Sequence, residues 1–193
     1  MCGIGGYVDP HGVLNGPAVL TSLGRALAHR GPDGEGFLVR QPFGLAHRRL
    51  AIIDLSDAAA QPMTVGPIVV VFNGEIYNYR ELRDELREHG QSFDGCSDTE
   101  VLARAYLCWG ERFVERLRGM WALAILDTRS ESLLCSRDPF GIKPFYYSGI
   151  GKLLVFSNTL TRSIDLLSVI EKRKYILGFV TEQRGCMLFQ IGT

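Results

Sequence analysis

The second residue of the chain is a cysteine, which could supply a nucleophile and its base together. Removal of Met1, which small second residues generally permit, would leave Cys2 with a free α-amine beside its thiol. Unperturbed pKa values are about 7.7–8.0 for such an amine and about 8.5 for the thiol, so both titrate near neutral pH. The amine could then assist attack by the thiol. The alternative interpretation is a small buried residue in a first strand, and with Met1 retained the nitrogen is an amide without basicity.

An Asn-Gly pair, Asn73 and Gly74, follows an apolar run that is typical of a strand. One interpretation is a tight hairpin, because Asn-Gly between strands is a strong signal for a type I′ turn. The other is an oxyanion site, in which the Asn73 amide and the Gly74 backbone N–H donate to a developing negative charge. Glycine would also let the backbone come close to a ligand. The residues alone leave both interpretations open.

Three charged residues could bind the polar ends of a substrate. Arg49 could offer its planar guanidinium to a carboxylate, although a solvated arginine on a strand edge explains it equally simply. Asp98 is placed in the first turn of an expected helix, where the helix dipole favours a carboxylate in any case. Together, Glu75 and Asp98 could hold a substrate ammonium group.

The remaining reactive side chains show no pattern of a metal site, and we expect no metal. The histidines have neither ligand spacing nor a triad context; they are His11, His29, His47 and His89. The cysteines are scattered without a C-x-x-C pair, which argues against both metal binding and a disulfide framework. They are Cys2, Cys96, Cys108, Cys135 and Cys186.

Overall charge and hydropathy exclude several classes of protein. Basic and acidic residues number 21 each, so there is no basic field to attract nucleic acid or an anionic membrane. No apolar stretch approaches the roughly 18 residues that a membrane-spanning helix requires. The first residues also lack the basic and apolar regions of a secretory signal, so we expect a cytoplasmic protein.

The elements that must position these residues follow from apolar periodicity and turn signals. A capping box at Ser97 and Glu100 predicts a helix that begins there. Two prolines and a glycine predict a rigid turn over Arg137–Pro144. Because strands and helices do not alternate regularly, we expect antiparallel sheets and the α+β class, in a single domain over 1–193. Strands are predicted at 2–8, 45–55, 67–73, 121–127, 133–137, 145–148 and 153–157, and further helices at 17–29 and 79–89.

The motifs, taken in order, resemble the N-terminal glutaminase domain of glutamine-dependent asparagine synthetases. The resemblance covers residues 2–158, and the joint match of six blocks is far more specific than any one of them. The blocks are Met1-Cys2-Gly3-Ile4, His29-Arg30-Gly31-Pro32-Asp33, Arg49-Leu50 with Ile52, Asn73-Gly74-Glu75-Ile76-Tyr77-Asn78, Ser97-Asp98-Thr99-Glu100, and Arg137-Asp138-Pro139-Phe140-Gly141 with Lys143-Pro144.

The resemblance implies a fold and a role for each matched residue. The fold would be a four-layer αββα sandwich of two antiparallel sheets, of the N-terminal nucleophile (Ntn) hydrolase type. Cys2 would be the nucleophile, and Asn73 and Gly74 would form the oxyanion hole. The other matched residues would bind glutamine or order the pocket: Arg49 its carboxylate, Glu75 and Asp98 its α-amine, Leu50 and Ile52 the site wall, and Arg30 and Asp33 a covering loop.

The implied reaction is glutamine hydrolysis through a glutamyl thioester on Cys2, without a cofactor. In the family, the ammonia passes to a synthetase domain that uses ATP and Mg²⁺. We expect that domain to be absent here, because no Ser-Gly-Gly-x-Asp-Ser loop occurs in the sequence. The expected partners are L-glutamine and an ATP-dependent synthetase domain or subunit, and a homodimer is left open.

Departures from the family pattern leave two rival hypotheses open. Phe156-Ser157-Asn158 stands where the family usually has a Ser-Glu pair, and residues 159–193 diverge and look like a shortened lead into the synthetase domain. One rival is a catalytically silent docking or regulatory module of the same fold. The other is a glutaminase that serves a different acceptor in a specialised pathway, since the acceptor is determined by another domain.

Overall fold

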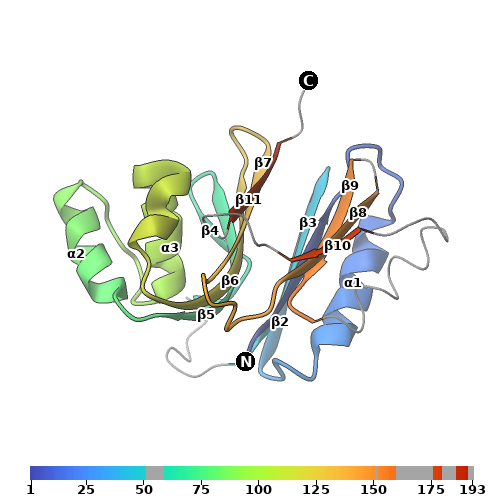
Figure 1. Cartoon of the computed structure of the whole chain (residues 1–193), viewed down its shortest axis with the longest axis horizontal. Helices are drawn as coiled ribbons and strands as arrows, with labels where there is room; N and C mark the ends of the chain where they lie inside the picture. Colours follow the sequence, from blue (N-terminus) through green and yellow to red (C-terminus); the bar gives the residue numbers. More distant parts are fainter. Residues whose placement is uncertain (51–58, 151, 160–175, 180–185, 191–193) are drawn as a thin grey trace.

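The protein folds as two stacked antiparallel sheets with helices on both outer faces (Figure 1). The computed structural model describes residues 1–50, 59–150, 152–159, 176–179 and 186–190. All strand pairs within these ranges are antiparallel. The expected α+β class with two antiparallel sheets is therefore confirmed.

The first sheet has the strand order β10-β8-β9-β1-β3-β2. Its central strand, β1, begins one residue after Cys2, and every one of its residues is buried. It pairs with β3 on one side and with β9 on the other, so the start of the chain is held inside the sheet. The strands are β1 Gly3–Val8, β2 Gly34–Arg40, β3 Phe43–Arg49, β8 Tyr146–Ile150, β9 Leu153–Ser157 and β10 Ile176–Phe179.

The second sheet has the order β11-β7-β6-β5-β4. Its longest ladder joins β5 to β6, from Ile68 paired with Asp127 to Ile76 paired with Gly119. The Asn-Gly pair therefore lies inside a strand, and its interpretation as a hairpin turn is wrong. The strands are β4 Met63–Val65, β5 Ile68–Ile76, β6 Gly119–Asp127, β7 Ser132–Arg137 and β11 Cys186–Gln190.

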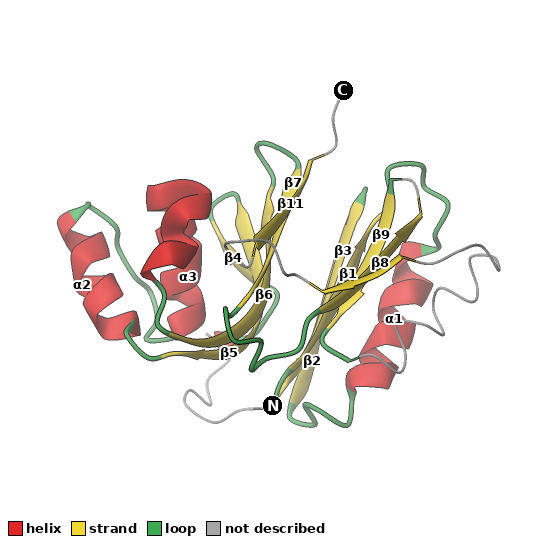
Figure 2. Ribbon diagram, in the orientation of Figure 1, coloured by secondary structure: helices red, strands yellow, loops and turns green. Residues whose placement is uncertain are grey.

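The helices complete a four-layer αββα arrangement, which Figure 2 shows edge-on. Helix α1 (Gly16–Leu27) packs Leu20 and Leu23 against the outer face of the first sheet. Helices α2 (Tyr79–Glu88) and α3 (Asp98–Trp109) bury their apolar faces on the second sheet, and a short 3₁₀ helix, η2 (Gly110–Arg116), follows α3. A third apolar cluster fills the space between the sheets. In the described residues, no helix is long and apolar enough to cross a membrane.

The start of α3 matters for the site and differs in detail from the expected capping box. Ser97 caps the helix as predicted, because its Oγ accepts from the Glu100 N–H at 3.2 Å. The Glu100 carboxylate does not return to Ser97; it accepts from the backbone N–H groups of Asp94 and Gly95 at 2.9 and 2.8 Å. The preceding loop is thereby tied to the helix whose first residue is Asp98.

Several elements were not anticipated from the sequence. Strands β2 and β4 and the 3₁₀ helix lack a clear periodic pattern, and β3 begins at Phe43 rather than Leu45. In the divergent tail, β10 pairs with β8 and β11 pairs with β7, so the tail supplies an edge strand to each sheet. The end of the strand predicted at 45–55 falls partly outside the described residues.

Candidate functional site

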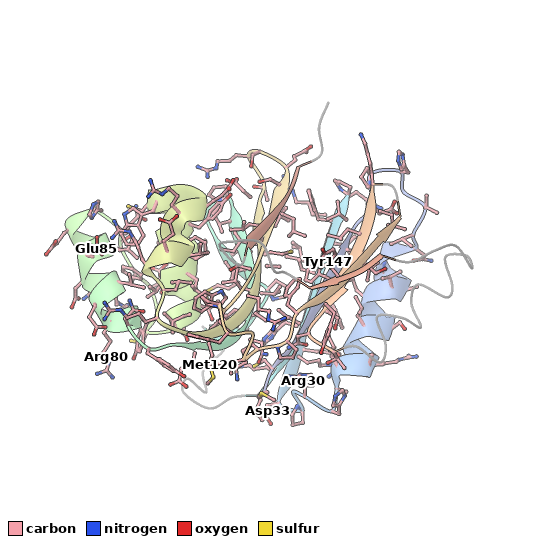
Figure 3. The ribbon with its side chains drawn as sticks, viewed as in Figure 1. Arg30, Asp33, Arg80, Glu85, Met120 and Tyr147 are labelled. Carbon is pink, nitrogen blue, oxygen red and sulfur yellow. The ribbon has the colours of Figure 1, made fainter. Side chains whose placement is uncertain are left out.

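A cavity of about 280 Å³ opens at one end of the sandwich, between the two sheets. The first sheet contributes Cys2 and the end of β3, and the second contributes β5 around Asn73 and Gly74. Helix α3 closes it with its N-terminal residues, including Asp98. Figure 3 shows Arg30, Asp33 and Met120 at this same end of the molecule, close to the N-terminus marked in Figure 1. The volume is near the lower end of small-molecule pockets, about 300 Å³.

Cys2 is fixed by contacts from three directions. Its Sγ lies 3.4 Å from the backbone nitrogen of Leu50, which donates to it, and 3.7 Å from the Leu50 oxygen. The carbonyl oxygen of Cys2 accepts from Arg30 Nε at 3.2 Å and from Asn158 Nδ2 at 2.9 Å. The thiol is half-buried and lines the cavity. A nucleophile with a fixed backbone and an accessible sulfur is the arrangement that acyl transfer requires.

Asn158 is a site residue that sequence reasoning noticed only as a departure from a family pattern. It is fully buried, and its side chain accepts from the Ile4 N–H at 3.0 Å while donating to the Cys2 carbonyl. Its own N–H donates to the Ile4 carbonyl at 3.0 Å. A carboxylate at this position could accept the Ile4 bond but could not donate to Cys2. Asn158 therefore holds the residue that carries the thiol.

The outer edge of β5 presents a row of backbone N–H groups toward the cavity. In an antiparallel strand, alternate N–H groups point to opposite edges. Tyr77 donates to Arg118 at 2.7 Å on the β6 side, so the even-numbered groups point away from β6. Phe72 donates to Gln61 Oε1 at 2.6 Å and Ile76 donates to Asp98 Oδ2 at 3.3 Å on that outer edge. The Gly74 N–H lies between them and points into the cavity that Gly74 lines.

The side chain of Asn73 supplies a second donor at the same point. Asn73 is 2% exposed, and its Nδ2 has no hydrogen-bond partner within the described part of the chain. Leaving a buried donor unsatisfied costs about 1–3 kcal/mol, so its retention points to a ligand that accepts from it. Gly74 cannot be replaced easily, because a Cβ there would clash with the Met120 carbonyl oxygen across the ladder.

Two carboxylates, Asp98 and Glu75, line the cavity near the end of β5. Burial raises the pKa of Asp98, and the adjacent Glu75 charge adds to the rise, whereas backbone N–H groups including that of Ile76 oppose it. Glu75 itself is exposed. A poorly solvated carboxylate beside a second one gains from a cationic ligand. The structure thus places both predicted carboxylates on the cavity wall, and their binding of an ammonium group stays a prediction.

Arg49 and His47 reach the cavity from β3, two residues apart. Alternate residues of a strand share a face, so His47 lies on the same face of β3 as Arg49, the predicted carboxylate binder. The sequence alone had given His47 no role. His47 is 1% exposed, and burial, with a contribution from the Arg49 charge, lowers its pKa to about 4. The imidazole is therefore neutral at pH 7, and Arg49 is the charged group that this strand presents to the cavity.

The structure brings together most of the remaining predicted residues. Leu50 lines the cavity and contacts the Cys2 sulfur through its backbone. Arg30 supports the Cys2 carbonyl, and Asp33, which is exposed, is joined to Arg49 by a 3.0 Å bond from its N–H to the Arg49 oxygen. Neither Arg30 nor Asp33 lines the cavity wall itself. Ile52 lies outside the described residues.

No cluster of three or more metal-ligating side chains occurs among the residues whose positions are described. The cavity instead combines a thiol with two aligned donors, a guanidinium and a carboxylate pair. These groups can attack a carbonyl, bind the resulting oxyanion and hold both charged ends of a small zwitterion. The observed set is suited to acyl transfer from an amino acid.

The sequence matches a known family over nearly its whole length. The family model described as a glutamine amidotransferase domain matches residues 1–174. An asparagine synthetase (glutamine-hydrolyzing) 1 of Bacillus subtilis is 38% identical over 82% of this chain and 26% of its own length. An asparagine synthetase (glutamine-hydrolyzing) of Zea mays is 44% identical over 76% of this chain and 25% of its own length. A putative asparagine synthetase (glutamine-hydrolyzing) 2 of Methanocaldococcus jannaschii is 35% identical over 91% and 37%.

A solved structure supports the fold independently. Glutamine phosphoribosylpyrophosphate amidotransferase from Bacillus subtilis, complexed with ADP and GMP, superposes with a TM-score of 0.73. The match covers 99% of this chain and 49% of the amidotransferase chain, at 19% sequence identity. This likeness concerns the fold and agrees with the predicted sandwich of two antiparallel sheets. The chain spans between a quarter and two fifths of the length of the curated relatives reported above.

Proposed function

The chain belongs to the glutamine amidotransferase domain family, and on that premise we propose that it hydrolyses L-glutamine to glutamate and ammonia. The observation that carries the proposal is that Cys2 lines the same cavity as two hydrogen-bond donors of β5. These donors are the Gly74 N–H and the unsatisfied Nδ2 of Asn73. A catalytically silent module of the same fold would gain nothing from such a donor. The cost of leaving it unpaired therefore favours an enzyme over a docking module.

In the proposed mechanism, Cys2 acts only after Met1 has been removed. Its thiol attacks the side-chain amide carbon of glutamine, and its own α-amine accepts the thiol proton. The oxyanion is stabilised by the Asn73 amide and the Gly74 N–H, which are fixed in a strand before the reaction begins. The α-amine then protonates the leaving nitrogen, and ammonia departs from a glutamyl thioester. Water hydrolyses the thioester to glutamate and restores the thiol.

Glutamine binding is proposed to use both charged walls of the cavity. Arg49 would bind the α-carboxylate, and Glu75 and Asp98 would bind the α-ammonium group. The ammonia would be passed to an ATP-dependent synthetase region, where ATP and Mg²⁺ would act. The names of the curated relatives support asparagine synthesis as the pathway, and an acceptor other than aspartate is the second candidate.

The test of the proposed function is glutamine hydrolysis by the purified chain, with intact mass measured on the same sample. The chain without Met1 should release glutamate and ammonia in equal amounts, and hydroxylamine should trap the thioester as a glutamyl hydroxamate. A matched control carries an uncleaved N-terminal extension, which keeps the fold but turns the Cys2 nitrogen into an amide; it should be inactive. A processed, folded chain that releases no glutamate and forms no hydroxamate contradicts the proposal.

Arg49 gives a prediction that separates binding from chemistry. Replacing Arg49 with alanine should raise the glutamine KM by about 10–100-fold, because a hydrogen bond to a charged group is worth about 1.5–3 kcal/mol. The kcat should change much less. Steady-state kinetics over a wide glutamine range measures both.

The adjacent residue offers the control for Arg49. Arg48 lies on the same strand but turns to the other face, where its Nε donates to the Gly24 carbonyl at 2.9 Å and its guanidinium pairs with Glu35. Arg48→Ala should leave the KM near the wild-type value. An unchanged KM in Arg49→Ala would show that Arg49 does not bind glutamine.

A further inference from the structure

Lys143 is a buried cation in the cavity without a matching anion. It is 7% exposed and lines the same cavity as Cys2. Its Nζ contacts the sulfur of Met1 at 3.5 Å, and no ion pair joins it to a carboxylate of the described chain. A thioether is only a weak acceptor, and burying an ammonium group without a counter-ion is costly. Such a residue is expected to persist only where its charge acts on something in the cavity.

The acid closest to Lys143 in the chain is already engaged by backbone groups. Asp138 is 2% exposed and accepts from the N–H groups of Trp121, Ile142 and Lys143 at 3.3, 2.9 and 2.9 Å. These bonds fix the loop between β7 and β8 and aim the Lys143 side chain toward the N-terminus. The loop thereby determines where the positive charge lies.

Processing of the chain changes the surroundings of this charge. The sulfur that Lys143 contacts belongs to Met1, the residue whose removal the proposed function requires. Five covalent bonds separate that sulfur from the Cys2 nitrogen, so Nζ lies within roughly 10 Å of that nitrogen. Removal of Met1 would therefore leave the ammonium group of Lys143 within roughly 10 Å of the new α-amine of Cys2.

Resting on the proposed function, we propose that Lys143 is a positioning residue that acts through its charge, keeping the α-amine of Cys2 in its uncharged, basic form. A positive charge disfavours protonation of a neighbouring amine. At roughly 10 Å and an effective dielectric constant of about 20, the interaction corresponds to roughly one pH unit. The amine would then be available as a base at a pH where an isolated one is largely protonated.

Other charged groups around the cavity set the background against which Lys143 acts. Arg30 donates to the Cys2 carbonyl and adds positive charge, as does Arg49 from β3, while the pKa of His47 keeps it neutral at pH 7. Acidic side chains lie on the opposite wall and favour a protonated amine. The titratable groups that line the cavity besides Cys2 and Lys143 are His47, Arg49, Glu75, Tyr77, Tyr79, Cys96 and Asp98; beside them lie Arg30, Asp138 and, next to Arg30, Tyr146.

The test compares Lys143→Met, which removes the charge with little change in length, with Lys143→Arg, which keeps it. The first readout is the acid limb of the pH profile of kcat/KM for glutamine. The second does not require activity and is made in a Cys2→Ala background, where no thiol can pass an acetyl group to the amine. It is brief acetylation with acetic anhydride across the pH range, followed by mass measurement of the tryptic peptide that ends at Arg25. Arg112→Met is the control, because it removes an exposed charge whose side chain is 78% accessible.

In Lys143→Met, both the acid limb and the acetylation curve of the N-terminal amine should move to higher pH by roughly one unit. Lys143→Arg and Arg112→Met should keep the wild-type positions. Unmoved curves in Lys143→Met overturn the proposal, and so does a fall in kcat/KM that is equal at every pH, which indicates a structural role. A wild-type chain that does not hydrolyse glutamine defeats the proposed function, while the acetylation curves still decide the role of Lys143.

Discussion

Replacing Cys2 with alanine should lower glutamate release from glutamine by roughly 10⁴-fold or more, to the background rate. The thiol is the group that attacks glutamine in the proposed mechanism, and no thioester can form without it. The Arg30 and Asn158 side chains hold the backbone carbonyl of this residue, so the variant should keep its fold. Glutamate release and hydroxamate trapping at saturating glutamine measure the loss.

A second cysteine, Cys108, provides the control for the Cys2 result. Cys108 lies near the far end of α3 from Asp98 and packs against the core of the second sheet. Cys108→Ala should retain near wild-type activity, and a neutral alkylating reagent should inactivate it as fast as the wild type. Activity that survives in Cys2→Ala would show that another group performs the hydrolysis.

Replacing Asn73 with alanine should lower kcat by about 10²–10³-fold while the KM for glutamine changes little. The Nδ2 donor is buried and unsatisfied in the described structure, so its favourable contact forms only when an oxyanion develops beside it. The Gly74 N–H, which remains, accounts for the residual rate. Asn73→Asp should be at least as impaired, since it removes the donor and places a negative charge at the oxyanion.

A comparison with Asn15 separates this effect from loss of stability. Asn15 caps α1 on the outer face of the first sheet, where its side chain accepts from the Ala18 N–H at 3.3 Å. Asn15→Ala should cost about 1 kcal/mol of stability without changing kcat. If Asn73→Ala kept the wild-type kcat, Asn73 would be an ordinary residue of β5 and the oxyanion site would lie elsewhere.

Local sequence signals pointed to reactive side chains more directly than they predicted the secondary structure that carries those side chains. The position of Cys2 is evident from the first residues, and Ser97 caps α3 as its pattern predicts. The Asn-Gly pair alone left a hairpin turn open because turn propensity is a local quantity, whereas the pairing of β5 with β6 is determined by contacts far along the chain. The same glycine that is typical of turns is required here for close strand approach.

The missed site residues share the property that only the tertiary structure gives them a role. His47, Asn158 and Gln61 belong to no motif, yet each is placed against the cavity or the residues that form it. A buried histidine or amide has no periodic signature, since its partners lie on other strands. One weak signal existed: an asparagine at position 158, where the family usually has an acid, implies a changed hydrogen-bond demand nearby.

The two tail strands also determine which backbone edges the two sheets expose. Strand β10 covers the open side of β8 and strand β11 covers the open side of β7. A chain trimmed after Asn158 would expose unpaired backbone N–H and C=O groups along β8 and along β7. Such groups can pair with a strand of another copy. Such covering depends on main-chain bonds rather than on particular side chains. The tail therefore keeps β8 and β7 paired and leaves the shorter strands β10 and β11 as edges of the two sheets.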